Sequence, residues 1–132
     1  MTTNQDHDVL LVDDDPLILM LVERRLHNSG LTLKTCDSGC KALDYLGEAR
    51  VRLLLVDLHM KPMNGLELLE TLANDNRRGL ARAFLATSAM PEDAVCERLV
   101  KLDVGLVMKE DIVAAGGVAK LMDGVSQPHG SS

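Results

Sequence analysis

Short, continuous runs of apolar residues alternate along this chain with longer segments in which apolar residues recur every three or four positions. The apolar runs are Val9–Val12, Leu31–Cys36, Leu53–Val56, Ala83–Ala86 and Leu106–Met108. A short apolar run without alternation is typical of a strand that is buried on both faces of a parallel sheet. The run 31–36 alternates more than the others and predicts a more amphipathic strand.

The segments between these runs carry the start signals of helices. Asp15 supplies a capping side chain and Pro16 suits the first helical position, so we expect a helix to begin there. The other expected helices begin at Ser38, Gly65, Pro91 and Asp111. Gly116 and Gly117 interrupt the last helical pattern, at a cost of ~1 kcal/mol for each glycine relative to alanine.

Strands that alternate with helices predict an α/β fold, a doubly wound five-stranded parallel sheet with helices on both faces. The chain has 132 residues, which is the size of a single domain. We expect one domain over residues 8–125, with flexible segments at 1–7 and 126–132.

Polar residues gather at the ends of the predicted strands. The residues in question are Asp13–Asp15, Asp57, Thr87, Ser88 and Lys109. In a doubly wound sheet the ligand site lies beyond the carboxyl ends of the strands. The sequence therefore predicts that these side chains share one site.

The chemistry of this site follows from its charge. The carboxylates of Asp13, Asp14 and Asp57 would repel one another, and Mg²⁺ is the cation that suits an all-oxygen site. Together with Lys109 a divalent ion would bring the formal charge of the site to zero. A carboxylate beside a metal and a lysine can accept a phosphoryl group, and Thr87 can then donate a hydrogen bond to it.

Composition excludes several other classes of function. The chain has 14 basic and 20 acidic residues and a formal charge of -6, so it has no general attraction to nucleic acid or anionic lipid. Its aromatic residues are only Tyr45 and Phe84, which is too few for a base-stacking surface. No apolar run reaches the ~18 residues of a membrane span, and the three cysteines come without an export signal. We therefore expect a cytoplasmic protein with reduced thiols.

Four blocks of sequence carry a resemblance that covers about residues 8 to 125. The blocks are VLLVDDDP, LLLVDLHMKPMNG, AFLATSA and VGLVMK. In this order and spacing they resemble the receiver domain of response regulators, the phosphoacceptor module of two-component signalling. The resemblance implies a flavodoxin-like strand order, 2-1-3-4-5.

The resemblance also implies a role for each residue. Asp57 would be the phosphorylated aspartate, and Asp13, Asp14, Asp57 and the backbone carbonyl of His59 would bind Mg²⁺. Thr87 would be the switch hydroxyl, and Lys109 would contact the phosphoryl group. From the residues alone, Ser88 remains an alternative source of the hydroxyl.

Three positions depart from the family's pattern. Lys61 stands before Pro62 where the family has proline directly after Met60, which predicts a shifted loop. Glu110 follows Lys109 where proline is usual; we expect a trans peptide bond there and a displaced lysine. Leu106 takes the place of an aromatic residue, so output through rotation of a ring is not expected.

These observations leave three hypotheses. The first is a phosphorylated signalling module, not an enzyme apart from assisting its own phosphorylation and dephosphorylation. Its partners would be a histidine kinase or histidine phosphotransfer protein, a downstream protein target or fused output domain, and a second copy in a phosphorylation-dependent dimer. The second is a receiver-shaped constitutive interaction module that is not phosphorylated. The third, a phosphohydrolase, needs a general acid where His59 stands.

Overall fold

The computed structural model describes residues 6–75 and 82–126, without the side chains of 124–126. The strands are β1 (His7–Val12), β2 (Leu33–Cys36), β3 (Val51–Asp57), β4 (Arg82–Thr87) and β5 (Gly105–Met108). The helices are α1 (Pro16–Leu26), α2 (Gly39–Leu46), α3 (Gly65–Asn74), α4 (Asp93–Leu102), α5 (Lys109–Val113) and α6 (Gly117–Ser126). Within these residues, no helix has both the length and the apolarity that crossing a bilayer requires.

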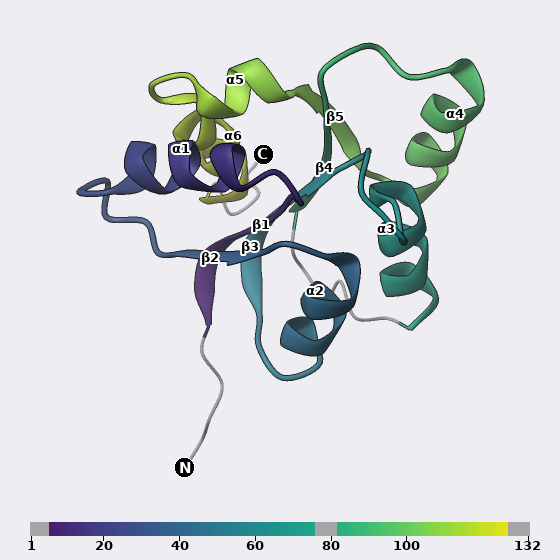
Figure 1. Ribbon diagram of the computed structural model, residues 1–132, viewed down its shortest axis with the longest axis horizontal. Coiled ribbons are helices and arrows are strands. Elements are labelled where there is room, and N and C mark those ends of the chain that lie inside the picture. Colours follow the sequence, from purple (N-terminus) through teal and green to yellow (C-terminus); the bar gives the residue numbers. More distant parts are fainter. Residues whose placement is uncertain (1–5, 76–81, 127–132) are drawn as a thin grey trace.

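The five strands form one parallel sheet in the order β2-β1-β3-β4-β5, so the predicted fold class and strand order are confirmed. Figure 1 shows α1, α5 and α6 on one side of the sheet and α2, α3 and α4 on the other. The chain runs outward from β1 to β2 and then returns past β1 to β3. Because strand order reverses there, the carboxyl ends of β1 and β3 border the crevice where such sheets bind ligands.

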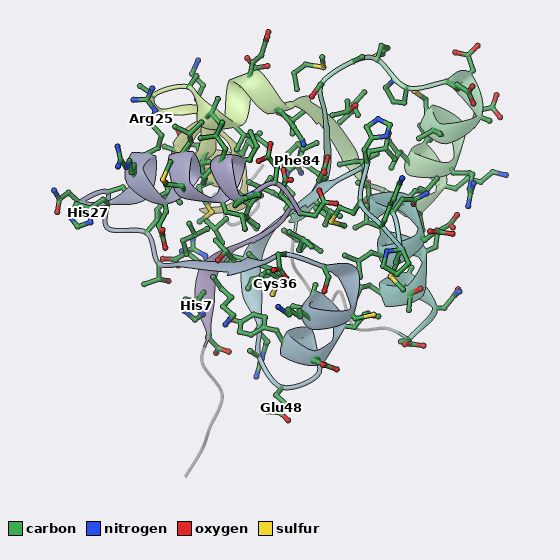
Figure 2. All side chains as sticks on the ribbon, in the orientation of Figure 1. His7, Arg25, His27, Cys36, Glu48 and Phe84 are labelled. Atoms are coloured by element: carbon green, nitrogen blue, oxygen red, sulfur yellow. The ribbon has the colours of Figure 1, made fainter. Side chains whose placement is uncertain are left out.

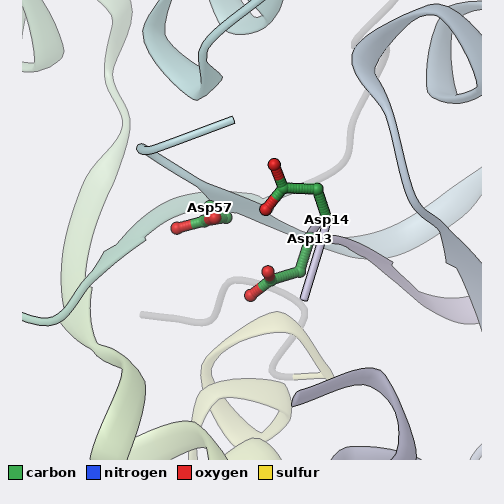
Figure 3. Close-up of side chains that lie close together, drawn as sticks. All are labelled: Asp13, Asp14 and Asp57. Carbon is green, nitrogen blue, oxygen red and sulfur yellow. The ribbon is translucent and has the colours of Figure 1, made fainter. Parts of the chain in front are cut away.

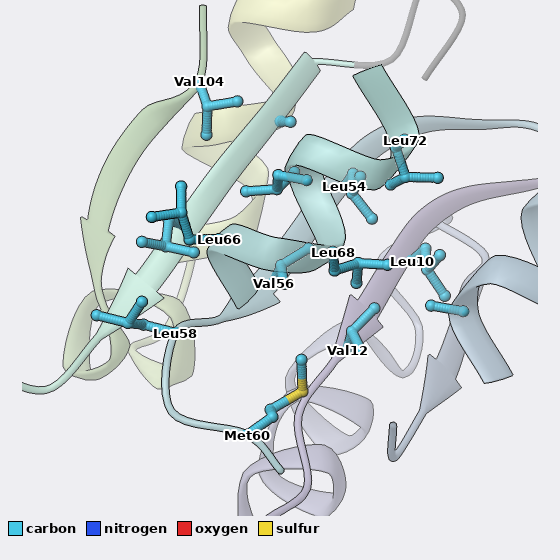
Figure 4. Packing of buried hydrophobic residues seen from close by; sticks show 14 of the residues in the cluster. Leu10, Val12, Leu54, Val56, Leu58, Met60, Leu66, Leu68, Leu72 and Val104 are labelled. Atoms are coloured by element: carbon cyan, nitrogen blue, oxygen red, sulfur yellow. The ribbon is translucent and has the colours of Figure 1, made fainter. Parts of the chain in front are cut away.

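The two faces of the central strands are buried in separate apolar clusters. Leu10, Val12, Leu54 and Val56 pack with residues of α2, α3 and α4 (Figure 4). Their chain neighbours Val9, Leu11, Leu53 and Leu55 pack with residues of α1, α5 and α6. Each such side chain contributes about 1.5–3 kcal/mol on full burial. Burial on both faces explains why these strands are continuous apolar runs rather than alternating ones.

The side chains in Figure 2 illustrate this division between interior and surface. Phe84 and Cys36 are buried, whereas His27 and Glu48 are exposed and lie at the margin of this view. The edge strand β5 is only half-buried along its length, because no strand pairs with its outer side. The described cysteines Cys36, Cys40 and Cys96 are all free thiols, as expected.

Two strand boundaries differ from the sequence prediction. β1 begins at His7, inside the segment 1–7 that was predicted to be flexible, because His7 pairs with Val51 of β3. β2 begins at Leu33 rather than Leu31, since the Thr32 amide and hydroxyl both donate to the Asp8 carboxylate. Of the two predicted flexible segments, residues 1–5 and 127–132 lie outside the described part of the chain, and Ser126 ends α6.

The fourth helix begins at Asp93, so the prediction of a start at Pro91 was wrong. The Thr87 hydroxyl and the backbone of Ala89 form a local turn after β4. Glu92 is still extended, with φ -64° and ψ 156°, and occupies the N-cap position. The turn therefore displaces the helix start by two residues.

The last helical segment is two helices, and the prediction that Asp111 caps a single one was wrong. Asp111 lies inside α5, which ends at Val113, and α6 begins at Gly117. Gly116 has φ +77°, a left-handed conformation that favours glycine. At Gly117 a Cβ atom would overlap the carbonyl oxygen of Asp111. The glycine pair therefore permits a sharp change of direction between two closely packed helices.

Candidate functional site

Adjacent strands bring the first two carboxylates of the site together. Val12 of β1 pairs with Val56 of β3, so Asp13 and Asp57 leave the sheet side by side. Both are buried, at 1% exposure, in a protein whose described buried polar residues otherwise number only Thr87. The Asp13 amide donates to the Cys36 carbonyl of β2, which fixes the path of the chain beyond β1.

Asp14 completes a group of three carboxylates at this edge of the sheet (Figure 3). One oxygen from each of Asp13, Asp14 and Asp57 can be chosen so that all lie within 4.8 Å of one another. Carboxylate oxygens are among the ligands that Mg²⁺ prefers in proteins. The three carboxylates are therefore a group that could hold one cation.

Asp15, the third acidic residue of the run, has a different role. Its carboxylate caps α1 by accepting a hydrogen bond of 2.9 Å from the Leu17 amide. Its own amide donates, also at 2.9 Å, to Oδ1 of Asp13. Asp15 is thus the cap that the sequence predicts, and its backbone orients Asp13.

Lys109 lies at the junction of β5 and α5 and reaches both buried carboxylates. Its Nζ atom lies 3.0 Å from Oδ1 of Asp57 and 3.2 Å from Oδ2 of Asp13. The only cis peptide bond among the described residues is Lys61–Pro62, so the bond from Lys109 to Glu110 is trans, as expected. The lysine is nevertheless in contact with the acidic pocket.

Burial and charge shift the protonation of this cluster. Burial, with a smaller contribution from the charge of Asp57, raises the pKa of Asp13 to about 6, against the opposing hydrogen bond from the Asp15 amide and the opposing charge of Lys109. Burial by itself lowers the pKa of Lys109, but the hydrogen bond and charge of Asp57 and the charge of Asp13 outweigh it, and the net pKa is raised. The lysine therefore stays charged and holds the two carboxylates together.

The loop between β3 and α3 wraps around Asp57. The His59 amide donates to Oδ1 of Asp57 at 3.3 Å, and the His59 side chain is exposed. The loop closes where the Gly65 amide donates to the Leu58 carbonyl at 3.0 Å. The His59 amide is thus placed beside Asp57, and the role of its carbonyl as a metal ligand stays a prediction.

A capping box, which was not among the sequence predictions, fixes the start of α3. The Asn64 side chain accepts from the Glu67 amide at 2.8 Å, and the Glu67 side chain accepts from the Asn64 amide at 2.9 Å. The signal was available, because a capping residue followed three positions later by Glu is typical of a helix start. The close approach of Gly65 to Asp57 was also missed, and nothing in the sequence pattern shows it.

The hydroxyl of Thr87 is buried but is bonded within its own strand end. Its Oγ1 atom donates to the Ala89 carbonyl at 2.7 Å. Ser88, the alternative hydroxyl, is exposed. Thr87 ends β4, next to β3 in the sheet, and the choice between Thr87 and Ser88 as the switch hydroxyl stays a prediction.

The strand position expected to lack a ring does lack one. Leu106 is half-buried and packs against the cluster on the side of α2, α3 and α4. The Phe84 ring belongs to the opposite cluster, and it lies so close to Gly105 that a Cβ there would come within 2.7 Å of it. β5, with the sequence Gly-Leu-Val-Met, carries no aromatic side chain.

The family of the chain is established by sequence comparison. A model of the response regulator receiver domain matches residues 9–109. The chain belongs to the response regulator receiver domain family. The receiver domain resembles the transcriptional regulatory protein GlrR of Escherichia coli K12, with 42% identity over 60 residues, or 46% of this chain and 14% of GlrR. It also resembles the heme response regulator HssR of Staphylococcus epidermidis, with 38% identity over 66 residues, or 50% of this chain and 30% of HssR.

Solved structures agree with this assignment. A two-component response regulator of Legionella pneumophila superposes with a TM-score of 0.79 and 26% identity, over 90% of this chain and 97% of that one. The chemotaxis protein CheY4 of Vibrio cholerae has a TM-score of 0.78 and 20% identity, over 93% of this chain and 99% of that one. The likeness to CheY4 shows the fold alone. The receiver domain matches well under half the length of GlrR and HssR, which are longer proteins.

Proposed function

We propose that this receiver domain accepts a phosphoryl group on Asp57 from a histidine kinase or histidine phosphotransfer protein, in a reaction that requires Mg²⁺. Phosphorylation then changes its contacts with other proteins. The observation that carries the proposal is the contact of Lys109 with both Asp57 and Asp13, at 3.0 and 3.2 Å, beside a third carboxylate. This arrangement combines a nucleophile, a metal-binding acidic pair and a fixed cation in one pocket.

The donor set fits Mg²⁺. Carboxylate and carbonyl oxygens are the ligands this ion prefers, and it usually keeps several waters. Asp13, Asp14 and Asp57 would supply carboxylate oxygens, and His59 would supply its backbone carbonyl. When bound, Mg²⁺ would neutralise charge on the oxygens of the phosphoryl group.

The two oxygens of Asp57 have different surroundings. Within the described residues, the contacts of this carboxylate from His59 and Lys109 both fall on Oδ1. Oδ2 is therefore the oxygen that attacks the phosphorus of a phosphohistidine. The new O–P bond forms as the P–N bond breaks, and the donor's imidazole keeps the bonding pair and takes up a proton.

Two further residues act on the product. Lys109 is already held at the pocket and can follow the phosphoryl group without leaving Asp13. Thr87 can donate to a phosphoryl oxygen only after it releases the Ala89 carbonyl, because a hydroxyl has one proton. The domain thus assists its own phosphorylation and dephosphorylation by positioning and charge, and it is a signalling module rather than an enzyme with a separate substrate.

The longer relatives indicate the kind of downstream partner. GlrR is a transcriptional regulatory protein and HssR a response regulator, and both are longer than the matched region. We infer that this domain acts in the cytoplasm on a separate protein target or on a fused output domain, without itself binding nucleic acid or membrane. A dimer that forms on phosphorylation is a further expectation.

A constitutive interaction module is the alternative function. Leu106 in place of a ring and Glu110 in place of proline favour it. The close contacts among Asp13, Asp57 and Lys109 argue against it, because a domain that is never phosphorylated has no need to bury two carboxylates around a lysine.

The test is to incubate the protein with Mg²⁺ and either acetyl phosphate or beryllofluoride and to follow intact mass and backbone amide shifts. Asp57→Asn should abolish the mass gain and the shifts. Asp15→Asn is the matched control, since asparagine also caps helices, and it should respond like the native protein. No response in the native protein would favour the constitutive module.

A further inference from the structure

We propose that Gly65 is a positioning residue of the phosphorylation site: by having no side chain, it lets the start of α3 close the loop that presents His59 beside Asp57. The inference rests on the proposed function, because it concerns how the same site is held ready for Mg²⁺. Gly65 thus receives a role in the site although its close neighbours are the backbone of Asp57 and the side chain of Leu85, and not a carboxylate group.

The contact that requires glycine is with the phosphoacceptor's own backbone. Gly65 is the first residue of α3 and is buried. A Cβ atom at this position would overlap the carbonyl oxygen of Asp57 and would come within 2.8 Å of Cδ1 of Leu85. The backbone of Gly65 does not have a positive φ, so the requirement is for space and not for an unusual conformation.

The same residue closes the loop. The Gly65 amide donates to the Leu58 carbonyl at 3.0 Å, so residues 58–65 form a closed turn. Within this turn the His59 amide donates to Oδ1 of Asp57, and the His59 carbonyl is the proposed metal ligand. Any widening of the Leu58–Gly65 contact would therefore move a proposed ligand away from the carboxylates.

The capping box makes this coupling stiff. Asn64 and Glu67 hold the first turn of α3 through two reciprocal hydrogen bonds. The first turn therefore moves with the helix, and α3 is anchored by the buried side chains of Leu66, Leu68, Leu69 and Leu72. An added methyl group at position 65 cannot rotate away from a backbone oxygen, so α3 and the loop must separate from the end of β3.

Gly117 offers a matched control. It is also the first residue of a helix, α6, and a Cβ there would likewise overlap a backbone carbonyl oxygen, that of Asp111. This second clash lies on the opposite side of the sheet, with α5 rather than with β3. Gly65→Ala and Gly117→Ala therefore impose the same kind of steric conflict, but only the first imposes it on the phosphoacceptor.

The first experiment measures the affinity of the native protein and both variants for Mg²⁺ by calorimetry, together with urea unfolding. We expect Gly65→Ala to weaken Mg²⁺ binding by about tenfold or more, the usual effect of removing support from a metal ligand. Gly117→Ala should lower stability and leave the affinity within about twofold of native. Native affinity in folded Gly65→Ala, or an equal loss in both variants, would overturn the inference.

The second experiment uses the native protein and does not depend on whether Gly65→Ala folds. If the closed loop is the form that binds Mg²⁺, the ion must stabilise closure, by reciprocity. Hydrogen exchange of the Gly65 amide should then slow on addition of Mg²⁺, more than that of the Gly117 amide. Unchanged exchange at Gly65 in protein that binds Mg²⁺ would refute the positioning role alone, whereas absence of Mg²⁺ binding would refute the proposed function and this inference with it.

Discussion

The hydroxyl of Thr87 donates a hydrogen bond of 2.7 Å to the carbonyl of Ala89, and the Ala89 amide donates one of 3.3 Å to the hydroxyl oxygen of Thr87. Because the single hydroxyl proton is committed to this turn, contact with a phosphoryl group on Asp57 requires the turn to open. The segment that follows, from Met90 to Glu92, leads directly into α4. On the proposed function, phosphorylation of Asp57 would thereby be linked to the start of that helix.

This relationship predicts different effects for two substitutions at Thr87. Thr87→Ser keeps the hydroxyl and should retain the response of the amides of residues 88–90 and 92 to beryllofluoride. Thr87→Val should still bind Mg²⁺ and be modified at Asp57, yet lose most of that response, at a stability cost of about 1 kcal/mol. Two-dimensional NMR spectra of both variants check this; a native response in Thr87→Val would show that the hydroxyl is not the link.

A second prediction concerns Lys109. Its positive charge contacts Asp13 and Asp57, which are also the proposed ligands of Mg²⁺. In Lys109→Met the buried carboxylates of Asp13 and Asp57 lose their partner, and the metal-free protein should be less stable by about 3 kcal/mol. Mg²⁺ should bind more tightly than to the native protein, because one positive charge has gone. Urea unfolding and calorimetry measure the two effects, and weaker Mg²⁺ binding in the variant would contradict the expectation.

The adjacent residues Asp14 and Asp15 should affect Mg²⁺ affinity and stability in opposite ways. Asp14→Ala removes a proposed metal ligand that is exposed, so Mg²⁺ affinity should fall by at least about tenfold with little change in stability. Asp15→Ala removes the cap of α1 and should cost about 1 kcal/mol of stability while Mg²⁺ affinity changes far less. Equal losses of affinity in both variants would mean that the acidic pair has been assigned to the wrong residues.

The raised pKa of Asp13 predicts how stability depends on pH when no metal is present. Burial raises this pKa from 3.8 to about 6, so the folded state holds the proton more tightly than the unfolded state does. The resulting stabilisation is complete below pH 3.8 and is lost as the pH rises through about 6. Its size is on the order of 2–3 kcal/mol.

Asp13→Asn tests this, because asparagine imitates the protonated acid at every pH. The variant should gain stability relative to the native protein between pH 4 and pH 7 and should match it at lower pH, in urea titrations without divalent ions. At pH 7, Mg²⁺ should restore the lost stability of the native protein and leave the stability of the variant almost unchanged. A constant difference between the two proteins across this range would exclude Asp13 as the titrating group.

The sequence by itself determined the fold and which residues gather at one edge of the sheet. Short continuous apolar runs such as Leu53–Val56, alternating with helical segments, are typical of strands covered on both faces, and a parallel sheet places every residue that ends a strand at one edge. Asp13, Asp14, Asp57 and Lys109 were therefore predictable as neighbours before any distance was known. Both steps depend on local periodicity and on chain order, which a sequence displays directly.

Only the tertiary structure decided how the site is held. The turn between Thr87 and Ala89 delays α4 until Asp93, and contact with α5 divides the last helical segment at Gly116 and Gly117. Lys109 reaches Asp57 although the proline expected after it is missing, because β5 and its pairing with β4 set its position. The space at Gly65 is likewise fixed by Asp57, a residue from another element. Such contacts depend on the packing of segments that are distant in the chain, and local sequence patterns do not predict this packing.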